Sequence, residues 1–83
     1  MNYDGVPQSI RAFVYRRSGG RCEGHYRRKD ISGQYEAEYL GECSNEGNDI
    51  AHINPNRMGG SKLLDSEDNL LYLCRNCHRD FDG

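Results

Sequence analysis

The chain contains no tryptophan, and hydrophobic residues make up only 35% of its 83 positions. It has no apolar segment near the roughly 18 residues that a membrane-spanning helix needs. The first residues, MNYDGVPQ, also lack the basic and apolar regions of a secretory signal. These absences disfavour a large pocket for an apolar ligand and a membrane partner. We therefore expect an intracellular, cytoplasmic location.

Eighty-three residues are enough for one domain with a thin core. A chain of this size buries only about 60–65% of the surface that it exposes when unfolded, so small domains often depend on a disulfide or a metal ion. Four cysteines are available for such a link. In a reducing compartment cysteines are more often metal ligands than disulfides, which favours a structural zinc ion.

The formal net charge is −2, but the charges are unevenly distributed along the chain. Seven basic residues fall between Arg11 and Lys29, whereas acidic residues gather later. A basic face can bind phosphates and steer DNA to the protein whatever the total charge, although it can also be plain solvated surface. The predicted DNA-binding residues are Arg16, Arg17, Arg21, Arg27, Arg28, Lys29 and Arg57.

An amphipathic helix is predicted from Pro7 to Ser18. The apolar residues Ile10, Phe13 and Val14 fall at positions i, i+3 and i+4, which share one face of a helix. Proline suits the first turn, and the glycine pair that follows residue 18 is typical of a helix end. Most of the arginines in this segment lie off the apolar face.

Shorter patterns predict the other elements. In residues 21–43, Tyr35, Ala37 and Tyr39 alternate with glutamates, which suggests a hairpin or extended loop with one short strand. The remaining expected elements are a strand at Asp49–Ile53, a loop at Asn54–Gly60, a strand at Asn69–Leu73 and a short helix at Arg75–Asp82. The leucines expected in the core are Leu63, Leu64, Leu70, Leu71 and Leu73.

The four cysteines have the spacing of a zinc site. Cys74 and Cys77 form a C-x-x-C pair, a spacing at which both sulfurs can reach one tetrahedral metal ion. Cys22 and Cys43 can complete the site from the other half of the chain. Thioredoxin-like redox sites share C-x-x-C, but the βαβ surroundings that they need are absent. His25 is a competing ligand, and we favour Cys43 because four thiolates make a closed structural zinc site.

Three segments of the second half carry a composite motif: DIAHINPNRMGG, then NLLYLC, then RNCHRDFD. They place His52 at a strand end before a glycine loop, Asn69 before an apolar strand, and His78 directly after the C-x-x-C pair. In this order and context the residues resemble the HNH endonucleases, over about residues 20–82. The resemblance implies a ββα-metal module, in which a β-hairpin packs on a helix with the active site between them.

The fold predicted in this way is small α+β and zinc-stabilised. It consists of a ββα-metal (HNH, or His-Me finger) nuclease module over residues 21–83, with the amphipathic helix of residues 1–20 packed on it. The two parts are expected to form one compact domain.

The resemblance also implies roles for the three motif residues. His52 would be the general base that deprotonates the attacking water, since a histidine with the ordinary pKa of about 6.5 is largely neutral at physiological pH. Asn69 would hold the hairpin loop and orient His52. His78 would bind one divalent metal ion, magnesium or manganese, which contacts the phosphate and the leaving 3′ oxygen. Cleavage of DNA would then give 5′-phosphate and 3′-hydroxyl ends.

One position departs from the family pattern. The residue before the base is a metal-binding aspartate or histidine in many members, and here it is Ala51. His78 and Asp82 are four residues apart and so share a helix face, where we expect them to hold the ion together. Asp80 points elsewhere, and Asp49 is a weaker substitute for the missing ligand.

Ala51 also keeps a second function open, that of a zinc-binding nucleic-acid module without catalysis. In either case DNA is the expected partner. A small hairpin-and-helix module reads mainly the backbone and groove shape of DNA, so flanking domains of a longer protein or a homodimer would supply specificity. Restriction or phage defence is the expected biological setting.

Overall fold

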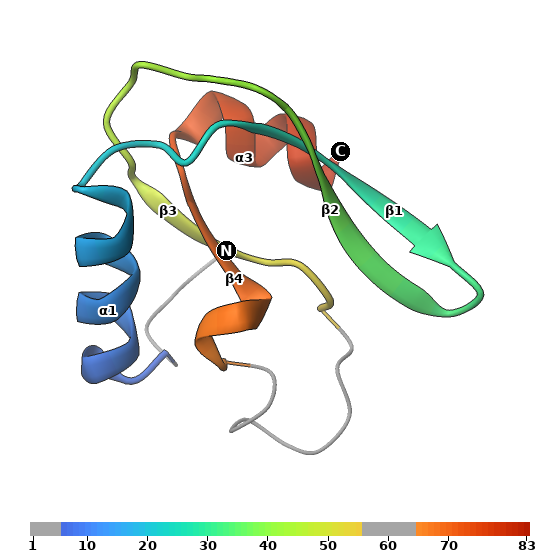
Figure 1. Cartoon of the computed structure of the whole chain (residues 1–83), viewed down its shortest axis with the longest axis horizontal. Coiled ribbons are helices and arrows are strands. Elements are labelled where there is room, and N and C mark those ends of the chain that lie inside the picture. The colour runs from blue at the N-terminus through green and yellow to red at the C-terminus, as the bar shows by residue number, and fades with distance from the viewer. Residues whose placement is uncertain (1–5, 56–64) are drawn as a thin grey trace.

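The computed structural model describes residues 6–55 and 65–83 (Figure 1). In chain order its elements are α1 (Gln8–Ser18), β1 (His25–Ile31), β2 (Gln34–Gly41), β3 (Asp49–His52), a 3-10 helix η1 (Glu67–Asn69), β4 (Leu70–Leu73) and α3 (Arg75–Asp82). In the described part, β1 pairs with β2 and β3 pairs with β4, both antiparallel. The predicted fold class, a small α+β domain, is confirmed. Neither of the described helices is long and apolar enough to cross a membrane.

The predicted N-terminal helix is present as α1. Pro7 precedes its first turn, and Gly19, in the left-handed conformation with φ 68°, ends it. Val14 is fully buried against Leu70 of β4, and Ile10 packs beside it. Phe13 was expected on the same buried face but is 39% exposed. α1 packs mainly against the single strand β4. The contact therefore covers only residues four positions apart on the helix, such as Ile10 and Val14.

Residues 21–43, expected to form a hairpin or an extended loop with one short strand, contain the hairpin of β1 and β2. Its two-residue turn, Ser32 and Gly33, has positive φ at both positions (53° and 84°), as a type I′ turn requires. Opposite charges face each other across the strands, as at Arg27 and Glu38. The apolar alternation that reveals a strand in a sequence is clear in β2 but weak in β1, because β1 carries charged residues on both faces.

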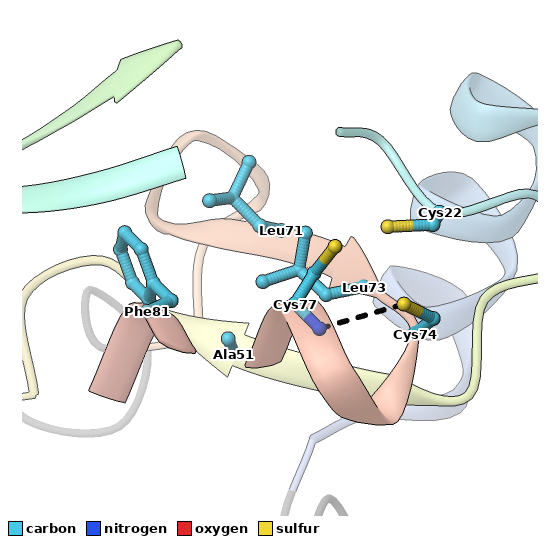
Figure 2. Close-up of a cluster of buried hydrophobic side chains, with 7 residues drawn as sticks. All are labelled: Cys22, Ala51, Leu71, Leu73, Cys74, Cys77 and Phe81. Atoms are coloured by element: carbon cyan, nitrogen blue, oxygen red, sulfur yellow. Dashed lines mark hydrogen bonds between the residues drawn. The ribbon is translucent and has the colours of Figure 1, made fainter. Parts of the chain in front are cut away.

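The β3–β4 hairpin and α3 form the centre of the molecule, between α1 and the β1–β2 hairpin (Figure 1). Their register places Asp49 opposite Leu73 and His52 opposite Leu70. Figure 2 shows the buried cluster that joins β3, β4 and α3, which comprises Cys22, Ala51, Leu71, Leu73, Cys74, Cys77 and Phe81. Two of the leucines expected in the core, Leu63 and Leu64, lie outside the described residues.

Candidate active site and metal centre

The end of β3 and the face of α3 bring the predicted base and the predicted metal ligands together. His52, His78 and Asp82 line one cavity of about 150 Å³. The other residues that line it are Arg28, Ile50, Ala51 and Pro55. Two imidazoles and a carboxylate on the wall of one small cavity can bind a cation and move a proton.

His78 is held between two carboxylates. Its Nδ1 lies 3.0 Å from Oδ2 of the buried Asp49, and its Nε2 lies 2.8 Å from Oδ2 of Asp82. Two adjacent ligands about 2.1 Å from one octahedral ion are about 3 Å apart, so Nε2 and the Asp82 oxygen fit a shared ion. Asp49 contacts the opposite edge of the ring and supports it there. Asp49 therefore lies where it can hold the His78 ring in place, on the side away from Nε2.

Ala51 stands where many family members carry a further ligand. Its side chain is 1% exposed and belongs to the cluster with Leu71 and Phe81. Within the described residues, the side chains placed to hold a catalytic ion would thus be those of His78 and Asp82. Magnesium commonly needs only one or two protein side chains, because water and substrate phosphates complete its coordination.

Asn69 holds the loop that follows the base. Its side-chain Oδ1 accepts a hydrogen bond from the Asn54 backbone N–H (2.9 Å), and its Nδ2 donates to the Asn54 carbonyl (3.1 Å). The backbone N–H of Ile53 also donates to the Asn69 carbonyl (2.8 Å). The buried asparagine therefore fixes the backbone just after His52, the place at which an orienting residue would act.

Asp65 is a site residue that the sequence analysis missed. Its Oδ1 lies 2.8 Å from Nε2 of His52, and the residue is only 8% exposed. Thirteen positions separate it from His52, and no regular element of the described chain connects the two. No periodicity or spacing rule could have paired them.

Arg28 was predicted as a DNA contact, but its guanidinium is used within the protein. It donates to the carbonyls of His52 (2.6 Å) and Ile53 (2.9 Å) and to Oδ1 of Asp82 (2.9 Å). The same group lies over the Phe81 ring, 4.4 Å from its centroid. Arg28 thereby ties the end of β3, which carries His52, to the end of α3, which carries Asp82.

The other predicted DNA-binding residues are arranged in different ways. Arg17 bonds the Glu23 carboxylate and the carbonyls of Glu67 and Leu70, which counts against a role in phosphate binding. Arg27 is exposed and paired with Glu38. Arg16 and Arg21 are exposed, Lys29 is half-buried, and Arg57 lies outside the described residues.

The four cysteines converge on one point. All four are free, and their sulfurs lie within 4.8 Å of one another. Sulfurs bound to one tetrahedral zinc at about 2.3 Å are about 3.8 Å apart, and the Cys43 and Cys74 sulfurs are 3.9 Å apart. The site could therefore hold a zinc ion. Figure 2 shows three of the residues, Cys22, Cys74 and Cys77, with the Cys77 backbone N–H directed at the Cys74 sulfur.

His25, the competing ligand, lies next to this cluster. Its Nδ1 is 3.3 Å from the sulfur of Cys77. Since the four sulfurs already provide a complete tetrahedral set, this nitrogen is placed to donate a hydrogen bond to a ligating thiolate. The geometry thus favours Cys43 over His25 as the fourth ligand.

Zinc binding is expected to depend steeply on pH. Burial raises the pKa of Cys22 and Cys77 above the ordinary 9.0. At Cys74 burial also raises the pKa, but hydrogen bonds from Cys77 and Asn45 outweigh it and lower the pKa to about 7. Zinc takes thiolates, so it must displace the protons of Cys22 and Cys77, and each proton displaced changes the affinity about tenfold per pH unit.

We therefore expect zinc affinity to fall by at least about 100-fold per pH unit as the pH drops from about 8 to about 6. Competition with a zinc-binding dye at several pH values measures this. If the zinc affinity stayed constant over this range, zinc would not be displacing protons from Cys22 and Cys77, and the expectation would be wrong.

Comparison with known proteins bears on the same residues. A family model described as HNH endonuclease matches residues 30–83, which is more than half of the chain. No curated protein matches the chain, and no solved structure does. The matched segment contains His52 of β3, Asn69 of η1 and His78 of α3. The chain belongs to the HNH endonuclease family.

Proposed function

We propose that the domain is a metal-dependent DNA endonuclease, with His52 as general base and with His78 and Asp82 as ligands of one magnesium or manganese ion. It would hydrolyse phosphodiester bonds to 5′-phosphate and 3′-hydroxyl ends. The observation that carries the proposal is the single cavity lined by these three residues in a chain of the HNH family. The family gives nuclease activity in general, and this cavity supports the particular roles.

In this mechanism His52 accepts a proton from the attacking water. A divalent ion held by His78 and Asp82 would offset the charge that develops on the phosphate and on the leaving oxygen. Asp49 accepts a hydrogen bond from Nδ1 of His78, which leaves the lone pair of Nε2 directed at the ion. Asn69 keeps the backbone after the base in place.

The four-cysteine site supports this arrangement from outside the cavity. Cys74 is the N-cap of α3 and Cys77 lies in its first turn, one residue before His78. A zinc ion on these sulfurs would fix the start of the helix relative to Cys22 and Cys43. We propose a structural role for this zinc, because four thiolates leave no open position for a substrate.

Nicking of supercoiled plasmid tests the proposal. We expect nicking by the zinc-loaded domain that requires added magnesium or manganese, and nicks that ligase reseals without prior phosphorylation. Asp82→Asn should raise the ion concentration needed by about tenfold or more, because it weakens one of two protein ligands. Asp80→Asn is the matched control, since it removes the same charge from an exposed position on the same helix.

The alternative is a zinc-binding nucleic-acid module without catalysis, which the alanine at position 51 favours. Plasmid that is bound but not nicked with either ion would support that alternative and contradict the proposed activity. We also propose that flanking domains of a longer protein, or a second copy of this chain, complete the DNA interface.

A further inference from the structure

We propose that Asp65 is the residue that positions His52, and that it makes Nδ1 of His52 the atom that takes the proton from water. This inference rests on the proposed function for its catalytic part. Its structural part, the protonation pattern of one imidazole ring, can be measured without any cleavage.

The contact is short and sheltered. Asp65 Oδ1 lies 2.8 Å from His52 Nε2, and the exposed fractions of the two side chains are 10% and 26%. The chain just after Asp65 is anchored: the Asn69 backbone N–H donates to the Ser66 carbonyl at 2.9 Å. An Arg17 N–H holds the carbonyl of Glu67, also at 2.9 Å. The carboxylate is thus supported by a structured backbone.

The chemistry of this contact selects one tautomer. An ionised carboxylate only accepts hydrogen bonds, so the ring nitrogen that faces it must carry the proton. Nε2 of His52 is therefore N–H, and the lone pair of the neutral ring is on Nδ1. A base acts through its lone pair, so the accepting atom is Nδ1.

The second histidine of the cavity is oriented the other way. His78 turns Nδ1 to the buried carboxylate of Asp49 and Nε2 to Asp82. Each ring thus has a buried aspartate on one nitrogen, but on opposite nitrogens. Nδ1 of His52 is thus left for proton transfer. With an ion between Nε2 of His78 and the Asp82 oxygen, that Nε2 would be the atom that binds the metal, so the two histidines would have separate roles.

The proposed step transfers one proton and exchanges one bond at phosphorus. One water proton passes to Nδ1, the water oxygen bonds to phosphorus, and the bond from phosphorus to the 3′ oxygen breaks. The ring becomes an imidazolium whose Nε2–H still bonds Asp65, so the developing positive charge lies beside a carboxylate. The departing oxygen takes a proton from solvent, and the ring later returns its proton to solvent.

Nitrogen-15 NMR of the histidine rings tests the structural part. At a pH where the rings are neutral, we expect the Nε2–H tautomer for His52 in the unmodified protein, and loss of that preference in Asp65→Asn. An asparagine offers both a donor and an acceptor, so it does not hold the ring in one tautomer. Glu67→Gln, which removes the same charge two residues away on an exposed side chain, should leave the spectrum unchanged.

Plasmid nicking tests the catalytic part. In Asp65→Asn we expect kcat to fall by about 10²- to 10⁴-fold, as when a supporting aspartate of a catalytic histidine is neutralised, with KM for DNA changed by no more than about twofold. Glu67→Gln should nick at the normal rate. An Nδ1–H tautomer in the unmodified protein, or full nicking by Asp65→Asn, would overturn the inference.

The two proposals can fail separately. If no variant nicks DNA but His52 shows the Nε2–H tautomer and loses it in Asp65→Asn, the nuclease proposal fails and the positioning role of Asp65 stands. If nicking depends on His52 but not on Asp65, the nuclease proposal stands and this inference is wrong.

Discussion

His52→Ala is expected to reduce metal-dependent nicking by about 10²- to 10⁴-fold, the contribution of a well-placed general base. The other parts of the site do not depend on the imidazole: His78 is held by Asp49 and Asp82, and the sulfurs lie outside the cavity. The measurement is the rate of plasmid nicking at saturating magnesium or manganese, together with zinc content and circular dichroism.

Alanine at this position also leaves the buried Asp65 carboxylate without its imidazole partner, which costs about 1–3 kcal/mol of stability. His52→Gln is therefore the matched variant, because its amide can still donate to Asp65 while it cannot act as a base. Added imidazole should partly restore nicking in His52→Ala. Unchanged cleavage in both folded variants would remove His52 from the mechanism.

Removal of zinc from a domain loaded with it at the four-cysteine site is expected to abolish cooperative unfolding. Zinc contributes about 10–16 kcal/mol in small structural sites, whereas a whole domain is stable by only about 5–15 kcal/mol. The site joins Cys22, Cys43 and the start of α3, which pack in the same buried cluster as Leu73 and Phe81. Without the metal, thermal melts followed by circular dichroism should show no sharp transition.

Cys77→Ala should behave like the chelated protein even with zinc present, because it removes a sulfur that is almost fully buried at the centre of the cluster. Zinc added back after chelation should restore the transition in the unmodified chain only. A metal-free protein that melts within a few degrees of the zinc-loaded one would show that the hydrophobic cluster suffices.

The sequence predicted the elements that have a clear local pattern. The helix α1, the strands β3 and β4 and the helix that starts after Cys74 all appear close to their expected positions. The β1–β2 hairpin showed a strand pattern only in β2, because β1 carries charged residues on both faces. Its stability comes from cross-strand pairing, which links residues distant along the chain.

By itself, the sequence determined the family, and it predicts which residues carry the chemistry, because side-chain types at fixed spacings are typical of a metal site and a base. Only the tertiary structure decided how those residues are supported. Asp65 beside His52, Asp49 behind His78 and Arg28 across both ends of the site are contacts between segments far apart in the chain. Such contacts depend on how the elements pack together, which no local pattern of residues encodes.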